Sequence, residues 1–288
     1  MSALTVAKKD FQDSVRSRWL WALTVLFVLF VAGLSYLFTS IPALGGVGQE
    51  DVTTVALLIS LSGPSGLLVP IIGIMISYKS IVGERESGTL KLLLSLPHRR
   101  LDAVIGKLLG RSLSLSVAIV LGFAIGLAVF VIQVSELDLV AYVSFLLLTL
   151  FFGIVYISIG VGLSSLTAST SKALALAVGF IVLFEFLWGF VPLVILFVIN
   201  GFSLDAVDLL EQPDWAEFVS SLAPGTAYNN AASAVLPDAN LGGPPANATQ
   251  AAGDPFYLQN EFGLVILAVW LVVPLAVGYV RFDGADLS

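Results

Sequence analysis

Six long stretches that are almost free of charged residues constrain this chain more than any other feature of its sequence. Each has about the 20 apolar residues that a helix needs to cross roughly 30 Å of hydrocarbon, where only helices and closed barrels satisfy every backbone polar group. Of the 288 residues, 58% are hydrophobic and only 11% are charged, which excludes an ordinary soluble domain. The sequence therefore predicts an all-α polytopic membrane protein, a single transmembrane domain over 1–288, with six transmembrane helices at about 20–38, 64–82, 112–132, 140–163, 173–199 and 262–280.

The basic residues predict the orientation, because loops that carry Lys and Arg stay in the cytoplasm. All 13 of them fall before the first span, between spans 2 and 3, between spans 4 and 5, or after the last span. We therefore expect a multi-pass protein of the cell membrane with both termini in the cytoplasm. An anionic outer surface and a net charge of −7 indicate an organism whose exposed surfaces face high salt, such as a halophilic archaeon. The opposite loops carry acidic residues only: Glu50, Asp51, Glu136, Asp138, Asp205, Asp208, Glu211, Asp214, Glu217, Asp238, Asp254 and Glu261.

Several kinds of chemistry lack the residues they need. There is no cysteine and His98 is the single histidine, so neither a disulfide framework nor a Cys/His metal site can be built. With only two methionines as well, the chain is a poor candidate for a copper conduit. Gly106-Lys107 is followed by Leu108 rather than Ser or Thr, so it is not a phosphate-binding loop. We expect no metal or cofactor in this chain, and any ATP to be bound by another protein.

Three segments outside the predicted spans have recognisable patterns. Residues 4–19 place their apolar side chains on one face, as in a helix lying in the membrane interface. Residues 52–63 are apolar but too short to cross, and Gly63-Pro64 predicts a helix break after them, so we expect a re-entrant or interfacial helix. The external loop, 200–261, begins with helical spacing that predicts short helices on the membrane surface. It also contains a glycosylation acceptor pattern at Asn247.

The segment 83–100, GERESGTLKLLLSLPHRR, is charged and rich in leucine, which is unusual for a solvated loop. Ser87-Gly88-Thr89 predicts a turn and a helix N-cap, and Pro97 ends the short transverse helix that follows. Three interpretations remain open for its leucines. The segment binds anionic lipid, or it packs on the ends of spans 2 and 3, or it docks into a groove on a partner protein.

The same region resembles a known family. Residues 77–110 contain the pattern E-x-E-x-G-T-L-x-x-L-L-x-x-P followed by G-K, and resemble the first cytoplasmic loop of ABC-2 type permeases, the membrane subunits of type V ABC exporters. KKDFQDSVRSRWLWALT, residues 8–24, and the six-span layout agree with this over essentially the whole chain. Within the family, the chain is most similar to the branch associated with maturation of nitrous oxide reductase.

The resemblance implies a homodimer of six-helix permeases on two copies of a separate ATPase, which binds ATP and Mg²⁺. In that family the transverse helix of the first cytoplasmic loop is the coupling helix, which lies in a cleft of the ATPase. Carried over to this chain, the residues that contact or border the ATPase are Glu84, Arg85, Glu86, Ser87, Gly88, Thr89, Leu90, Lys91, Leu93, Leu94, Pro97, Arg99 and Arg100.

Glu185 is the only charged residue near the middle of a predicted span, at about 20 Å along the helix from Lys172. A carboxyl group near mid-membrane is costly unless it is protonated, paired or in contact with water, so such residues often mark a transport pathway. In the family that the chain resembles, span 5 lines the dimer axis, which makes Glu185 a candidate for the substrate pathway. The alternative is a structural carboxyl group that is hydrogen-bonded to a neighbouring Ser, Thr or Tyr.

Three functions follow from these observations. The first is a permease that moves a substrate with the energy of a partner's ATP hydrolysis; its cargo is open, and lipid-like compounds, a polysaccharide or a maturation factor all fit. The second is a membrane scaffold that transmits the ATPase's motion to an extracytoplasmic accessory protein without moving cargo. The third, an intramembrane hydrolase with Ser164 as nucleophile, lacks a base because His98 lies in the cytoplasmic loop. Membrane lipids are further expected partners, and nucleic acid is not.

Overall fold

The computed structural model describes residues 3–41, 53–89, 100–133, 137–202, 213–236 and 255–284. Within these ranges the regular structure is entirely helical, as predicted. Six helical segments are long and apolar enough to cross a membrane, which confirms the number of predicted spans for this part of the chain. The elements are α1 (Ala3–Val15), α2 (Arg18–Ser40), α3 (Thr54–Ser77), α4 (Val82–Glu86), α6 (Arg100–Gln133), α7 (Leu139–Leu166), α8 (Thr170–Ile181), the π-helix η2 (Val182–Leu187), α9 (Phe190–Ile199), α10 (Asp214–Ser221), α11 (Pro224–Val235), the 3-10 helix η3 (Phe256–Leu258) and α12 (Phe262–Asp283).

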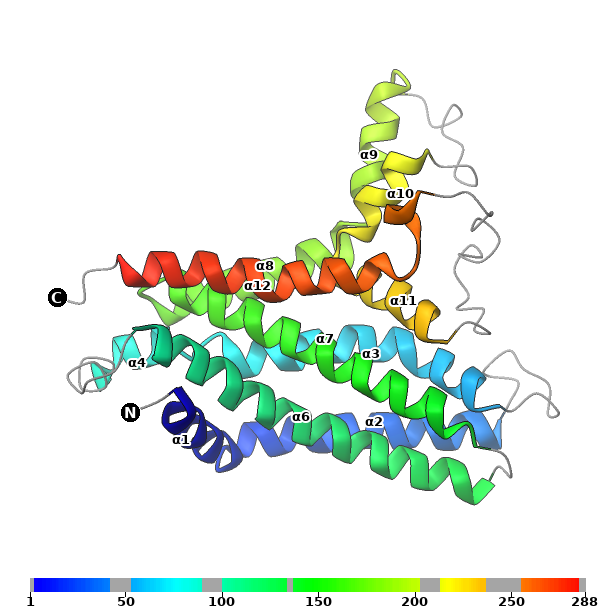
Figure 1. Cartoon of the computed structure of the whole chain (residues 1–288), viewed down its shortest axis with the longest axis horizontal. Helices are drawn as coiled ribbons and strands as arrows, with labels where there is room; N and C mark the ends of the chain where they lie inside the picture. Colours follow the sequence, from blue (N-terminus) through cyan, green and yellow to red (C-terminus); the bar gives the residue numbers. More distant parts are fainter. Residues whose placement is uncertain are drawn as a thin grey trace.

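The long helices form one bundle with α7 at its centre. α2 and α1 pack on α6, while α3 and α12 flank α7. Figure 1 shows both ends of the chain and α4 at the same end of this bundle, which we call the α4 end. Both termini therefore lie on one side, as an even number of crossings requires.

Aromatic rings and close helix contacts hold the bundle together. The ring of Tyr228 in α11 stacks on that of Phe152 in α7, with centroids 4.2 Å apart, and both side chains are fully buried. On the other side of the bundle, α6 approaches α2 closely at Gly122, where a Cβ atom would lie 2.6 Å from the ring of Phe27. Gly126 makes the same kind of approach to Val31. These two glycines therefore serve contacts within one chain.

The predicted break at Gly63-Pro64 is wrong, because α3 continues through this position and through Pro70. Pro64 removes one backbone hydrogen bond and would disfavour a helix in water. Here Leu57, Leu58 and Leu61 in the preceding turns are fully buried, so packing holds them in helical conformation. The hydroxyls of Ser60 and Ser62 donate to the carbonyl oxygens of Leu57 and Ile59 in their own helix. Residues 54–63 are thus part of the second span rather than a separate helix.

The first and third spans also differ from their predicted bounds. The chain bends at Arg16 and Ser17, so the helix predicted over 4–19 is α1 followed by the start of α2. The third span, predicted to begin at 112, is part of a helix that already begins at Arg100. Its first three turns carry charged side chains, which a search for uncharged windows excludes. The charges of Lys107 and Arg111 are paired with carboxylates of α1 and α4, as described below.

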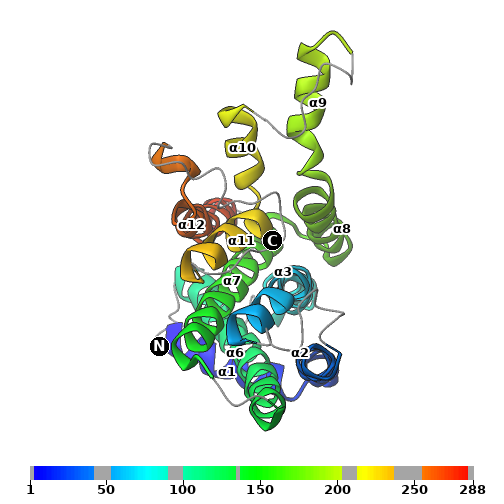
Figure 2. The same cartoon turned by 90° about the vertical axis from the view of Figure 1, so that its right-hand side faces the viewer.

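The fifth predicted span, 173–199, is not one straight helix. α8 passes into the π-helix η2, and the chain turns at Gly189 before α9. Figure 2 shows α9 projecting from the bundle on the side away from α2. A π-helix carries one extra residue per turn and is typical of functional positions, and Gly189 and Pro192 favour a bend here. Only Thr170–Leu187 qualifies as the fifth span by length and composition.

The described part of loop 200–261 contains a helix that was not predicted from the sequence. α11 follows the short α10, and it packs against α12, α7 and α3 rather than lying on the surface. Its buried face consists of Ala227, Tyr228, Ala231 and Ala232, whose spacing is helical. Two features of the sequence indicate this helix: Pro224 at its first position, and small residues at helical spacing around one tyrosine. The acceptor site at Asn247 lies outside the described residues.

Candidate functional site

α4, which contains the E-R-E part of segment 83–100, is attached to the rest of the bundle in three places at the α4 end. The first attachment is to α7. The Ser164 hydroxyl oxygen accepts hydrogen bonds from the backbone N–H groups of Ile81 (3.0 Å) and Val82 (3.1 Å). These groups have no partner within α4, so a buried side chain of α7 caps this helix. Ser164 is therefore a structural residue, and among the described residues its hydroxyl bonds only to these two backbone groups, which gives the hydrolase hypothesis no support.

The second attachment is a group of four charges, two of them buried, that joins α4 to α6 and α1. Lys107 Nζ donates to Asp10 Oδ1 (2.9 Å) and to Glu84 Oε1 (2.5 Å). Arg111 Nε lies 2.8 Å from Asp10 Oδ2, and the same guanidinium group donates to the carbonyl oxygen of Ile76 at the end of α3. Lys107 is 5% exposed and Asp10 3% exposed. Two positive and two negative charges thus compensate each other around the buried Lys107 and Asp10, and we call these four residues the charge cluster.

A glycine in α6 permits the charge cluster to form. A Cβ atom at Gly110 would lie 2.8 Å from the carbonyl oxygen of Ala7 and 2.9 Å from Cβ of Asp10. Since real Cβ atoms do not approach so closely, any side chain here would push α1 away from α6. Asp10 would then lie too far from Lys107 for a hydrogen bond. The close approach of the two helices therefore places the carboxylate of α1 in the cluster.

The third attachment is made by Glu86, which caps the first turn of α8. The backbone N–H of Thr170 donates to Oε1 of Glu86 (2.7 Å), and the Thr170 hydroxyl donates to Oε2 (2.5 Å). A carboxylate is favourable at a helix N-terminus because the unpaired N–H groups there carry partial positive charge. Glu84 and Glu86 thus connect one short helix to opposite sides of the bundle, namely to α6 with α1 and to α8.

The residues after α4 form the predicted turn, and Arg100 fixes the far end of the segment. Gly88 has a positive φ of 75°, a conformation that favours glycine, and the hydroxyls of Ser87 and Thr89 are 2.8 Å apart. Thr89 also makes a long hydrogen bond to the carbonyl oxygen of Glu84 (3.4 Å), and the helix that this turn was predicted to cap lies outside the described residues. Arg100 Nη1 donates to the carbonyl oxygens of Phe282 and Asp283, both at 2.6 Å, at the end of α12.

The structure thus places part of the predicted coupling set. Glu84, Glu86 and Arg100 make the contacts given above, and Arg85, Ser87, Gly88 and Thr89 lie beside them. Sequence reasoning missed Asp10, Lys107, Arg111, Ser164 and Thr170, although the G-K pattern drew attention to Lys107. The predicted transverse helix itself lies outside the described residues, with Leu90, Lys91, Leu93, Leu94, Pro97 and Arg99.

Glu185 lies in η2 and faces the centre of the bundle. The Tyr156 hydroxyl, near the middle of α7, donates a hydrogen bond to Glu185 Oε1. Gly225 of α11 lies directly against the same carboxyl group, so that a Cβ atom there would displace it. The half-buried carboxyl group of Glu185 is thus provided with a hydrogen-bond donor and with space beside α11. The alternative hypothesis, a structural carboxyl group, predicted a hydrogen bond of the kind that Tyr156 makes. The same hydrogen bond is also compatible with a residue that faces a substrate pathway.

Aromatic rings line the bundle next to Glu185. Phe184 stacks on Trp188, with ring centroids 4.8 Å apart, and lies edge-on to Trp270 of α12 at 4.9 Å. The indole N–H groups of both tryptophans donate to carbonyl oxygens around α10, those of Val219 and Leu222. The described part of the chain contains no group of three or more His, Cys, Asp or Glu side chains placed to hold a metal ion. The surroundings of Glu185 are thus apolar and aromatic.

Comparison with known proteins agrees with the arrangement described. The family model described as ABC-2 family transporter protein matches residues 4–287. The chain is 35% identical over 202 residues to the probable ABC transporter permease protein NosY of Pseudomonas aeruginosa, covering 68% of this chain and 72% of that protein. It is 34% identical over 200 residues to the protein of the same name from Stutzerimonas stutzeri, covering 68% and 71%.

Proposed function

Because the chain belongs to the ABC-2 family of transporter proteins and is the permease subunit of an ABC transporter, we propose that segment 83–100 couples the partner ATPase to movement of a substrate across the cell membrane. ATP hydrolysis belongs to the partner subunit and not to this chain. The observation that carries the proposal is the threefold attachment of α4 to α7, to α6 with α1, and to α8. A force applied to the segment reaches the bundle through all of these contacts.

The proposed orientation places the α4 end in the cytoplasm. Described basic residues gather at this end, among them Lys79, Arg100, Lys107 and Arg111, while the acidic Asp138 and Asp214 belong to the opposite loops. Basic loops remain on the cytoplasmic side during insertion. Both termini and segment 83–100 then face the compartment that contains ATP.

We further propose that two copies of the chain assemble, with α9 at their contact, on two copies of the ATPase. α9 projects from the bundle, and its apolar side chains are exposed around the helix: Phe190 is 59% exposed and Val194 58%. α9 has only 10 residues, which is too short to cross a bilayer by itself. A second copy placed across this side of the bundle would cover η2, where Glu185 lies, so that the substrate pathway would run between the copies.

Cysteine cross-linking tests the placement of α9. The chain has no native cysteine, so a single cysteine at Phe190, Val194 or Val198, spaced along one face of α9, is a unique reporter. We expect at least one of these variants to give covalent dimers with a short thiol cross-linker in membranes. Leu29→Cys is the matched control, since Leu29 is 66% exposed on α2, on the other side of the bundle. Dimers that form through Leu29 and not through α9 would contradict the proposed contact.

Glu185 is the residue that we propose contacts the substrate pathway. Glu185→Gln keeps the shape of the side chain, and its amide oxygen can still accept the Tyr156 hydroxyl. Assembly with the ATPase and ATP hydrolysis are therefore expected to be unchanged. Transport is expected to fall about tenfold, which is the effect of losing one charge-assisted hydrogen bond between the Glu185 carboxylate and the substrate. The measurement is ATP-dependent movement of a fluorescent phospholipid and of a hydrophobic dye in vesicles that contain the complex.

Two outcomes separate the candidate functions. Glu261→Gln is the control, because Glu261 is an exposed acidic residue at the start of α12. Equal transport by the two variants would end the pathway assignment of Glu185. Movement of neither probe by a complex that hydrolyses ATP and changes conformation would favour the second function, transmission of motion to an extracytoplasmic protein.

A further inference from the structure

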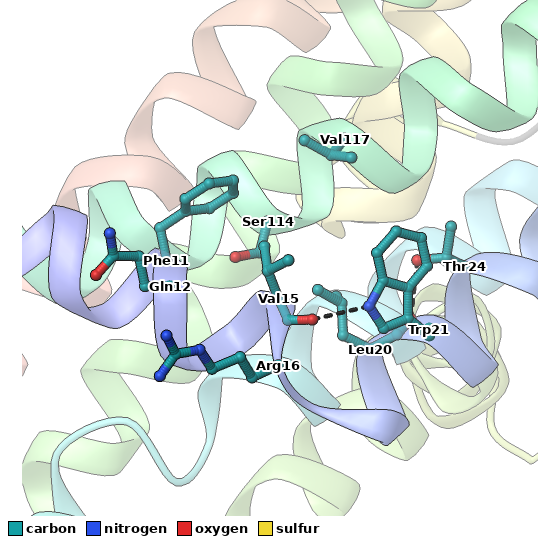
Figure 3. A pocket seen from close by; sticks show the side chains of 9 residues that line it. All are labelled: Phe11, Gln12, Val15, Arg16, Leu20, Trp21, Thr24, Ser114 and Val117. Carbon is teal, nitrogen blue, oxygen red and sulfur yellow. Dashed lines mark hydrogen bonds between the residues drawn. The ribbon is translucent and has the colours of Figure 1, made fainter.

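A cavity lies at the bend between α1 and α2, bordered by α6, and none of the contacts described so far uses it. It has a volume of about 330 Å³ and is drawn in Figure 3. The bend is fixed by Trp21, whose indole Nε1 donates to the carbonyl oxygen of Val15 (2.8 Å), one of the oxygens left unpaired at the end of α1. We call this space the elbow cavity. Because a hydrogen bond sets the bend, the cavity is a defined feature of the fold.

The two ends of the elbow cavity differ in polarity. Its interior is apolar, with Val15, Leu20 and Val117 in the walls. The hydroxyls of Thr24 and Ser114 also line it, but each donates to a carbonyl oxygen of its own helix. The interior therefore offers no hydrogen-bond donor to a polar guest.

Gln12 and Arg16 line the α1 side, and Figure 3 shows their polar groups next to one another. Both side chains are exposed, and among the described residues neither has a side-chain hydrogen bond or an ion pair. No residue that lines the cavity is acidic. The site is thus a cation above an apolar space.

The position along α2 matches the depth profile of a membrane leaflet. Trp19 is 73% exposed and Trp21 47% exposed, and tryptophan gathers at the boundary between headgroups and hydrocarbon. Thr24 lies six residues beyond Arg18, about 9 Å further along the helix. Arg16 is therefore at the level of headgroups, and the apolar end of the cavity is at the level of acyl chains.

We propose that the elbow cavity binds one phospholipid with an anionic headgroup, whose phosphate group accepts hydrogen bonds from Arg16 and Gln12 and whose acyl chain enters between α2 and α6. The volume of the elbow cavity, about 330 Å³, is at the small end of the range for ligand pockets, which is about 300 to 1,000 Å³. The cavity therefore holds part of one acyl chain and not a whole phospholipid. A guanidinium group suits phosphate because it donates from several N–H groups in a fixed geometry. The bound lipid contacts Phe11 and Val15 of α1 and so supports the helix that carries Asp10.

The test uses the purified full-length protein in nanodiscs made from equal parts of phosphatidylglycerol and phosphatidylcholine. Lipids that remain bound after transfer to detergent are identified by native mass spectrometry. We expect the wild type to retain phosphatidylglycerol in preference. Arg16→Gln should bind it about tenfold more weakly, as expected for a lost hydrogen bond to a charged group. Arg18→Gln is the matched control, since Arg18 is an exposed arginine two residues away that does not line the cavity, and it should retain the lipid.

A second variant tests the acyl chain. Val117→Trp fills the cavity from α6 without changing any charge, so it should also lose the lipid. Val117→Leu adds one methylene group and gives a graded loss if the tryptophan variant does not fold, which its melting transition reports. The proposal is overturned if the wild type retains both lipids equally, if Arg16→Gln and Arg18→Gln lose the lipid to the same extent, or if a folded Val117→Trp keeps it.

Discussion

Replacement of Lys107 by methionine is expected to destabilise the permease by about 3 to 5 kcal/mol, the usual cost of removing one partner from a buried ion pair. Lys107 is 5% exposed and is the only link between Asp10 and Glu84 within the charge cluster. Methionine fills the same space but leaves the carboxylate of Glu84 without its counter-charge. We expect a lower melting transition in detergent. Since α4 is then detached from α6, we also expect ATP binding by the partner to stimulate transport less.

Two further variants separate the effect of the uncompensated charge on Glu84 from the effect of removing a lysine side chain. Lys79→Met removes an exposed lysine from the same end of the bundle and should leave the melting transition nearly unchanged. Adding Glu84→Gln to Lys107→Met removes the uncompensated charge and should recover part of the stability, because a buried ion pair and a neutral replacement differ little. If Lys107→Met melts like Lys79→Met, the charge cluster does not contribute to stability and cannot be the attachment of α4 to α6.

The six spans could be predicted because a membrane selects on composition, and composition is visible in the sequence. A run of uncharged residues has few alternatives to a transmembrane helix. The same criterion hid the first three turns of α6, since Lys107 and Arg111 look unsuitable for a buried helix until Asp10 is placed beside them. Their partner is 97 residues away from Lys107 along the chain, and no local pattern records that distance.

The two glutamates of the E-x-E pattern show the same limit at short range. Residues two apart on a helix point about 200° away from each other, so the pattern implies two different partners. It does not say which partners, because Lys107 and Thr170 are brought to α4 by the packing of α6, α7 and α8. Pro64 is the opposite case, in which a strong local signal for a break was overridden by the burial of Leu57, Leu58 and Leu61.

The largest effect on assembly is expected from the leucines of segment 83–100, the part that we propose enters the ATPase. Burial of one leucine side chain stabilises a contact by about 1.5 to 3 kcal/mol. Leu93→Ala with Leu94→Ala is therefore expected to weaken binding of the ATPase about 100-fold or more. The ends of the segment remain fixed by Glu84 and Glu86 on one side and by Arg100 on the other. The permease itself should thus keep its melting transition.

The measurement is co-purification of the ATPase with the tagged permease. The matched control is Leu109→Ala with Leu113→Ala, which removes two exposed leucines from one face of α6 and should leave the ATPase bound. Reversal of charge at Arg85 tests the border of the same surface, and its effect should diminish at high salt if the residue acts electrostatically. A Leu93→Ala/Leu94→Ala permease that melts at a lower temperature and still binds the ATPase would show that these leucines pack within the permease. The attachments of Glu84 and Glu86 would then hold the segment against its own bundle, and the contact with the ATPase would have to be made elsewhere on the α4 end.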